Sequence, residues 1–300
     1  MSSQLANISA LAHVRSALLS WYATDHRDFP WRRTADPFAV LVSEVMLQQT
    51  RASRVAERFP TFMRRFPTAA ALAAATEADV LAAWSGLGYN RRALALRRAA
   101  IEVANHGWPQ DVEELARLPG IGPYTARAVA SLAFGAPVGV VDTNVRRWLV
   151  RRFGLRADTR PVELQALADA LAAAGSAADD AAPWTHATME FGAAICMPRN
   201  PRCVACPIAD GCPSRGMAAT VPVPRQASFA GSDRAYRGAI LRALAGAHHH
   251  AITMRAAGDL VPKAEVERVV AGLERDGLLH KADGRLVLGG RPEPAATIGS

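Results

Sequence analysis

Four cysteines within 17 residues constrain the fold of this 300-residue chain more than any other feature. The cysteines, with the spacing C-x6-C-x2-C-x5-C, are Cys196, Cys203, Cys206 and Cys212. Several prolines and a glycine lie between them and disfavour regular structure. We therefore expect a loop in which four sulfurs converge on one centre.

Three kinds of centre could use four such thiols. A disulfide pair is disfavoured because the chain has the character of a cytosolic protein, in which thiols stay reduced. Zinc sites usually combine two short cysteine pairs, whereas this loop has one short pair. An iron–sulfur cluster fits the spacing better, with zinc as the alternative. The run His248, His249 and His250 lacks a spaced partner cluster and is predicted to be an exposed loop rather than a second metal site.

The chain is basic, with 35 Lys and Arg against 27 Asp and Glu. Its net charge of +8 favours a phosphate-rich partner. No apolar run is long enough and free enough of charge to span a membrane, and the N-terminus lacks the pattern of a secretion signal. We therefore expect a cytoplasmic protein that binds a phosphate-rich partner and no membrane.

Apolar residues recur at helical spacing from the N-terminus up to the cysteine loop. Short connections marked by Gly, Pro or Asn separate the helices, and only 6% of residues are aromatic. This pattern predicts an all-α body. Its predicted helices lie near residues 11–21, 36–49, 51–65, 69–75, 77–85, 91–105, 111–117, 123–134, 143–153, 162–174 and 183–194.

The composition changes after the cysteine loop. Residues 216–233 are small, polar and proline-containing, as expected of a linker. Helical patterns over 236–244 and 263–276 precede an alternating segment over 278–288, centred on an Asp-Gly turn that is typical of a hairpin. Residues 234–300 are therefore predicted to form a small α+β, winged-helix-like module, with a purely structural appendage as the alternative.

One carboxylate lies in a helix that is apolar on nearly every side. The helix begins at Asp36, is predicted to be buried, and contains Glu44. Burial raises a carboxyl pKa, as a general acid near neutral pH requires. The alternative is that an arginine pairs with Glu44 and gives it a structural role.

A turn with two glycines follows, in the segment Leu118–Ala126. Gly120 and Gly122 permit a tight helix-hairpin-helix connection, whose free backbone N–H groups can hold a DNA phosphate. Such a turn contacts the DNA backbone and reads no base. A plain connection between two helices is the alternative.

About 20 residues later, Asp142 precedes a basic helix and is well suited to cap its N-terminus, where a carboxylate stays ionised. A protonated Glu44 and an ionised Asp142 could together cleave a glycosidic bond. One would donate a proton to the leaving base and the other would stabilise the oxocarbenium ion. N-capping alone is the other interpretation of Asp142.

Taken together and in order, these motifs resemble the MutY family of adenine DNA glycosylases, within the helix-hairpin-helix superfamily. The resemblance covers roughly residues 9–215. It rests on the segments Ser43–Thr50, Gly86–Tyr89, Leu118–Ala126 and Val141–Arg147 and on the cysteine loop.

The resemblance implies a helix-hairpin-helix glycosylase fold and a 4Fe–4S cluster rather than zinc. It implies a six-helix barrel over residues 30–137 and an iron–sulfur helical domain built from residues 1–29 and 138–215. The C-terminal domain related to Nudix hydrolases, which reads 8-oxoguanine in other members, is expected to be absent, with the winged-helix-like module in its place. The resemblance therefore leaves the base read opposite adenine open.

The resemblance also assigns roles to individual residues. Glu44 would protonate the adenine and Asp142 would stabilise the sugar cation, supported by Tyr124 and Asn144. Asn90 replaces a tyrosine usual in the family, and His186 replaces a Glu or Gln that contacts the adenine, where it could donate to a purine N7. Gln49, Thr50, Leu87 and Tyr89 would lie around 8-oxoguanine, with Tyr89 wedged into the base stack. The residues themselves place Gly120 and Gly122 of the glycine turn at the DNA backbone, and predict phosphate contacts by Arg199 and Arg202, which the cysteine loop holds in place.

The related endonuclease III proteins carry a hairpin lysine that attacks the sugar as an amine. Here Tyr124 occupies that place, and the only two lysines of the chain are Lys263 and Lys281. Without a hairpin amine no Schiff base can form, so the chain is predicted to be monofunctional. Its predicted activity is excision of adenine mispaired with 8-oxoguanine or guanine in double-stranded DNA. We expect a monomer that is associated with the nucleoid. The alternatives are a thymine or uracil mismatch glycosylase and a catalytically silent iron–sulfur DNA-binding protein.

Overall fold

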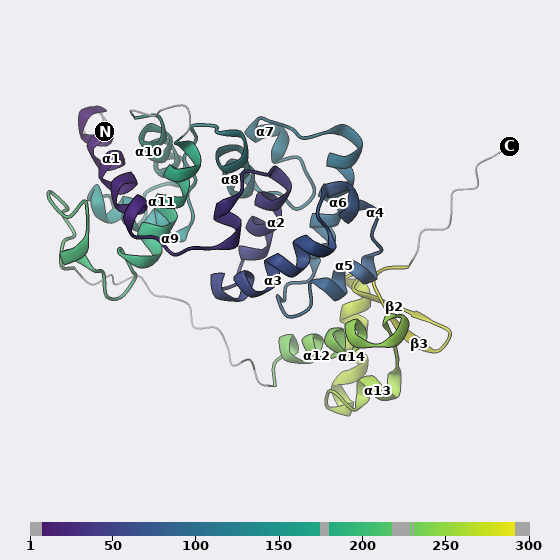
Figure 1. Cartoon of the computed structure of the whole chain (residues 1–300). Coiled ribbons are helices and arrows are strands. Elements are labelled where there is room, and N and C mark those ends of the chain that lie inside the picture. The colour runs from purple at the N-terminus through teal and green to yellow at the C-terminus, as the bar shows by residue number, and fades with distance from the viewer. Residues whose placement is uncertain (1–7, 175–179, 218–228, 230, 292–300) are drawn as a thin grey trace. The chain divides into compact units, whose positions relative to one another are not determined.

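The computed structural model describes residues 8–174, 180–217, 229 and 231–291 (Figure 1). The chain divides into two compact units. The first unit comprises residues 1–44 and 108–223, and the second comprises residues 45–107 and 224–300. The sequence-based domain boundaries stay predictions, and most of the predicted linker at 216–233 lies outside the described residues.

The first unit is a set of packed helices. The N-terminal helix packs against α10 and α11, and α11 also packs against α8 and α9. Their shared core contains Leu18, Trp148 and Phe191, all nearly inaccessible to solvent. The elements are α1 (Ile8–Thr24), η1 (Pro30–Arg33), most of α2 (Pro37–Leu47), α7 (Val112–Leu115), α8 (Pro123–Phe134), α9 (Thr143–Arg152), α10 (Pro161–Ala173), α11 (Ala181–Ala194) and η2 (Cys203–Ala205).

The second unit joins a helical part to the C-terminal module. In the helical part, Thr68 and Thr76 cap the N-termini of α4 and α5 by accepting backbone hydrogen bonds. The helices of this part are α3 (Ala52–Arg65), α4 (Ala69–Ala74), α5 (Glu77–Ala83) and α6 (Arg91–His106). The module contains α12 (Asp233–Gly246), η3 (His248–His250), β1 (Ala251–Thr253), α13 (Met254–Gly258), α14 (Lys263–Arg275), β2 (Leu279–Ala282) and β3 (Arg285–Leu288).

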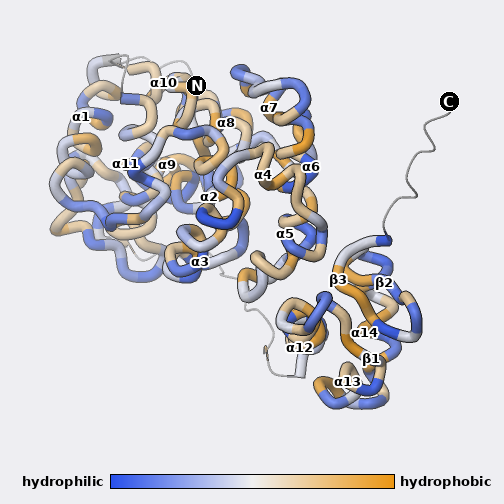
Figure 2. The backbone as a smooth tube through the Cα atoms, turned by 45° about the vertical axis from the view of Figure 1, so that its right-hand side comes forward, coloured by the Kyte–Doolittle hydropathy of each residue, from blue (hydrophilic) through white to orange (hydrophobic). Residues whose placement is uncertain are grey.

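The module contains a small antiparallel sheet in the order β1-β3-β2. Strands β2 and β3 form the predicted hairpin, with Leu279 opposite Leu288. Asp283 and Gly284 both have positive φ, of 47° and 70°, as the tight hairpin turn requires. The sequence analysis missed β1 and α13. Hydrophobic residues occur in both β1 and β3 (Figure 2).

Most helices have the predicted positions, and the predicted all-α body followed by a small C-terminal α+β module is confirmed. The histidine run forms a short 3-10 turn in which His248 and His249 are exposed. No described helix is long and apolar enough to span a membrane.

Candidate active site

Glu44 is buried in α2, with 3% of its surface exposed. Burial raises its pKa to about 7, although a hydrogen bond from the Tyr124 hydroxyl and the charge of Arg32 act in the opposite direction. The charge of Asp142 raises the pKa of Glu44 further. Within the described part of the chain, Glu44 forms no ion pair, so the predicted alternative of a purely structural arginine partner is not supported.

One oxygen of this carboxyl group finds no hydrogen-bond partner in the part of the chain that the structure describes. The Oε2 atom of Glu44 is buried without a partner among the described residues. Burying an unpaired polar atom is costly, and native proteins rarely do so without a reason. A protonated Glu44 therefore has a buried hydroxyl that can donate to a bound ligand.

Tyr124 lies in the first turn of α8, directly after the glycine hairpin. Burial raises its pKa well above the usual value, and the charges of Glu44 and Asp142 raise it further. Tyr124 consequently stays a neutral hydrogen-bond donor to Glu44. In the hairpin, Gly120 has a φ of 77° and Gly122 caps α8 without a side-chain hydrogen bond.

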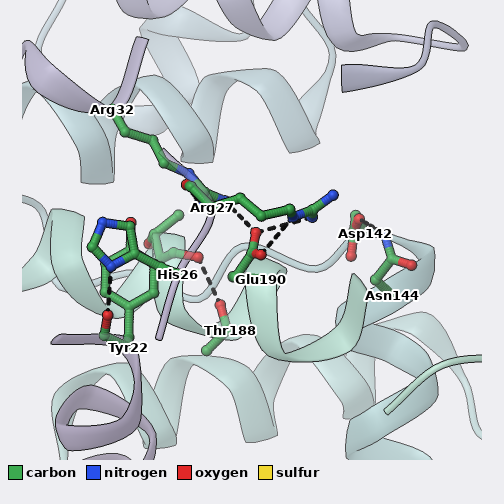
Figure 3. Close-up of polar contacts among 9 residues, drawn as sticks. Tyr22, His26, Arg27, Arg32, Asp142, Asn144, Thr188 and Glu190 are labelled. Carbon is green, nitrogen blue, oxygen red and sulfur yellow. Dashed lines mark hydrogen bonds and ion pairs between the residues drawn. The ribbon is translucent and has the colours of Figure 1, made fainter. Parts of the chain in front are cut away.

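Asp142 caps the N-terminus of α9, as predicted. Its Oδ2 accepts a hydrogen bond from Asn144 Nδ2 at 2.7 Å (Figure 3). Its Oδ1 accepts one from the Val145 N–H at 2.6 Å. Asn144 in turn accepts from Arg147 Nη2 at 2.9 Å, and Arg147 Nε donates to the Cys196 carbonyl at 2.8 Å. Both carboxylate oxygens are therefore held in place, and the chain of hydrogen bonds reaches the cysteine loop.

A second buried carboxylate, Glu190 on α11, was missed by the sequence analysis. It accepts hydrogen bonds from Arg27 Nε at 2.6 Å and from Arg32 Nη2 at 2.8 Å (Figure 3). Burial alone would raise the pKa of Glu190, but these hydrogen bonds outweigh it and hold the pKa below its ordinary value. The available sequence signal was the one used for Glu44, a single acidic residue within an apolar helix.

His186 lies in the same polar cluster as Glu190. Burial and, to a smaller extent, the charges of Arg32 and His26 lower its pKa to about 3. The imidazole is therefore neutral at physiological pH, with one donor and one acceptor nitrogen. Because the charge of Arg32 acts on both His186 and Glu44, the structure brings the predicted catalytic residues and this cluster into one site.

Gly192 allows α11 to approach Asn144 closely. A Cβ atom at this position would lie 2.8 Å from the backbone of Asn144. Gly192→Ala is expected to lower the free energy of unfolding by about 1–3 kcal/mol because the overlap must displace one of the two helices. Chemical denaturation would measure the loss, with Gly246→Ala as the control because that helical position faces open space. A Gly192→Ala protein as stable as the control would contradict this close packing.

The predicted opposite-base residues lie in the second unit. Arg92 donates to the carbonyls of Val45 at 2.7 Å and Gly88 at 3.1 Å, and to Thr50 Oγ1 at 3.0 Å. Burial lowers the pKa of Arg92 to about 10, so the guanidinium stays charged at neutral pH. It holds the turn after α2, which contains Gln49 (φ 57°), against the loop Gly86–Tyr89. In this loop, Leu87 is buried and Tyr89 is 47% exposed.

The four cysteines are free thiols that line one pocket, with Trp148 and Ile195 among its walls. Arg151 Nη1 contacts Cys196 Sγ at 3.3 Å, and the Gly216 N–H points to Cys203 Sγ at 3.5 Å, which suits ligated sulfurs that accept hydrogen bonds. Across the described residues, no three His, Cys, Asp or Glu side chains are arranged to hold a single metal ion. Arg199 and Arg202 are exposed in the same loop.

Comparison with known proteins agrees with this geometry. Residues 42–173 match the family described as HhH-GPD superfamily base excision DNA repair protein, and residues 196–212 match the iron–sulfur binding domain of endonuclease III. The chain is 43% identical over 290 residues to an adenine DNA glycosylase of Mycobacterium tuberculosis, which covers 91% of this chain and 92% of that protein. The chain belongs to the adenine DNA glycosylase family. Its cofactor is a 4Fe–4S cluster, which Cys196, Cys203, Cys206 and Cys212 would hold.

Other adenine DNA glycosylases and related structures differ in length. The human adenine DNA glycosylase is 39% identical, covering 70% of this chain but 40% of that protein. A solved thermostable thymine-DNA glycosylase is 30% identical with a TM-score of 0.63, and covers 69% of this chain and 98% of its own. A trapped endonuclease III–DNA covalent intermediate has a TM-score of 0.58 at 22% identity, over 69% of this chain and 96% of its own, and so shares the fold.

Proposed function

We propose that this chain is a monofunctional DNA glycosylase that removes adenine mispaired with 8-oxoguanine or guanine from double-stranded DNA. It would act as a monomer on chromosomal DNA in the cytoplasm. The observation that carries the proposal is the buried Glu44, whose pKa of about 7 and unpartnered Oε2 suit a proton donor. Membership of the adenine DNA glycosylase family supports adenine as the base.

The reaction uses two carboxyl groups in different ionisation states. Glu44 donates its proton to a ring nitrogen of the extruded adenine, and the base leaves with the electron pair of the C–N bond. The cation left on the deoxyribose is stabilised by Asp142, which Asn144 and the Val145 N–H hold in position. Water then adds to the sugar carbon and its proton passes to the Glu44 carboxylate, which leaves an abasic site and restores the acid.

Neighbouring side chains position these groups and the base. Tyr124 donates to Glu44 and fixes the orientation of its carboxyl group. His186 is neutral and can donate one ring N–H to the adenine. Glu190, Arg27 and Arg32 form a polar cluster joined by ion pairs. The charge of Arg32 lowers the pKa of both Glu44 and His186.

Contacts to the rest of the duplex complete the proposal. Gly120 and Gly122 would hold a phosphate, and the exposed Arg199 and Arg202 would add phosphate contacts from the cluster loop. Around the opposite base the residues would be Gln49, Thr50, Leu87 and Tyr89, with Tyr89 filling the gap that base extrusion leaves.

An excision assay tests the proposal against its rival. The 30% identity to a thymine-DNA glycosylase makes thymine the second candidate base. Purified protein is incubated with duplexes that carry A opposite 8-oxoguanine, G or C, and T or U opposite G, and then treated with alkali. We expect cleavage at A opposite 8-oxoguanine and G. Cleavage only at T or U would overturn adenine specificity, and strand nicking before alkali would overturn the monofunctional mechanism.

A further inference from the structure

A groove of about 950 Å³ lies within the second unit and is not used by the excision chemistry. One wall is formed by the turn after α2 and the loop that follows α5, including Gln49 and Tyr89. The facing wall belongs to the C-terminal module, chiefly α12. The groove therefore brings the predicted opposite-base residues together with a part of the chain that has no assigned role.

The lining of this groove is strongly basic. Among the described residues that line it are six arginines besides Arg92, against two acidic side chains, Asp233 and Asp276. These two carboxylates are already engaged, because Arg237 pairs with both of them. Positive charge in a hollow surface attracts polyanions. The six arginines are Arg54, Arg58, Arg91, Arg234, Arg237 and Arg242.

The two walls are joined by specific contacts. The Gly290 N–H at the end of the hairpin donates to Glu77 Oε2 on α5 at 2.8 Å. A Cβ atom at Gly289 would lie 3.2 Å from the Cβ of Glu77, so the hairpin approaches α5 closely. Helix α12 also packs against α5, and Arg91 lies 3.9 Å from Asp276. Specific packing between the C-terminal module and α5 therefore holds the two walls of the groove together.

The groove also carries groups that recognise bases rather than phosphates. Tyr89 and Phe229 expose 47% and 59% of their surfaces, and aromatic rings beside arginines are typical of surfaces that hold nucleic acid strands. Gln48 and Gln49 supply amide groups that can hydrogen-bond to base edges. Gln48 and Gln49 also follow the proton donor Glu44 by only four and five residues.

We propose that this groove binds the DNA strand opposite the target adenine, and that arginines of α12 hold the phosphates beside the unpaired opposite base. The inference rests on the proposed function, which assigns Gln49 and Tyr89 to that base. It assigns a DNA-binding role to the winged-helix-like module, because α12 and the helical part of the unit would contact the same strand.

The first test is the double variant Arg234→Ala/Arg242→Ala. Its control is Arg255→Ala/Arg275→Ala, which removes the same charge from exposed positions of the same module outside the groove. Affinity is measured by fluorescence anisotropy, with duplexes whose adenosine carries a 2′-fluorine so that its glycosidic bond resists cleavage. We expect the groove variant to bind about 10-fold more weakly and its salt slope to fall by about 2, one for each lost phosphate contact. Equal affinity and equal salt slope for the two variants would overturn the proposal.

The second test identifies the strand. Uncharged methylphosphonates replace the phosphates that flank the opposite base, or those that flank the adenine. On the opposite strand they should weaken wild-type binding but weaken the groove variant by no more than about 2-fold, because its arginine partners are already gone. If methylphosphonates on the opposite strand lowered the affinity of the wild type and of the groove variant by the same factor, the assignment would be overturned. Adenine excision by the wild type is followed in parallel, so failure of the proposed function is seen separately.

Discussion

Glu44→Gln is expected to lower the single-turnover rate of adenine excision by about 10³-fold, within the range that a general acid contributes. Glutamine has almost the same shape but no acidic proton, so the leaving adenine would depart as an anion. Duplex binding should be unchanged, because Glu44 is buried and contributes no surface charge. Glu113→Gln makes the same substitution at an exposed position of α7 and should leave the rate unchanged. A Glu44→Gln rate within a few-fold of wild type would exclude Glu44 as the proton donor.

The pH dependence of the wild-type rate follows from the same carboxyl group. Only the protonated form of Glu44 can act as the acid, and its pKa is about 7 because of burial. The rate should therefore be high below pH 7 and fall as the pH rises above it, approaching tenfold per pH unit. The residual rate of Glu44→Gln should lack this fall. Single-turnover measurements between pH 5.5 and 9 would show it, and a wild-type rate that is flat across this range would contradict the assignment.

Glu44 should also make the protein less stable at higher pH. Its pKa is about 7 in the folded protein against an ordinary value of 4.5, so folding favours the protonated form. The contribution of Glu44 to the free energy of unfolding is complete below pH 4.5. It is lost as the pH rises to 7, a difference of about 3 kcal/mol. Glu44→Gln should therefore gain stability over wild type as the pH rises from 5 to 8, as measured by urea unfolding. An inactive variant that is more stable than wild type is the signature of a strained functional group.

Local sequence patterns were sufficient to predict most of the helices and the burial of Glu44. Helical periodicity is a property of neighbouring residues, and a helix that is apolar on nearly every side has no solvent-facing position for Glu44. The cysteine spacing is equally local. By contrast, β1 has three residues, pairs with the distant β3, and carries no periodic signal of its own.

The parts of the site that were missed depend on contacts between distant segments. Arg27 and Glu190 are 163 positions apart, and only tertiary packing brings them together. Gly192 looks like any helical glycine until the structure shows Asn144 against it. The basic groove likewise combines α12 with a turn some 180 residues earlier. No spacing rule within one segment could have predicted these contacts.

Asp142→Asn and Asp142→Ala separate the two roles that the sequence left open for Asp142. Asparagine is as good an N-cap as aspartate, whereas alanine removes the cap at a cost of about 1 kcal/mol. If the negative charge stabilises the sugar cation, both variants should lose about 10²–10³-fold in single-turnover rate. If capping were the only role, asparagine would preserve the rate and alanine would not.

Stability measurements make this comparison decisive. The side chain introduced by Asp142→Asn would keep the acceptor for the Val145 N–H but would turn an amide toward Asn144 Nδ2, so we expect a loss of about 1 kcal/mol. Such a loss leaves the protein folded and cannot account for a 10²-fold slower reaction. Asp111→Asn makes the same change at the N-cap of α7 and should leave the rate intact. Because the Asp142 carboxylate is held from both sides before substrate binds, its charge needs no rearrangement when the cation forms, and that preorganisation is what the asparagine variant removes.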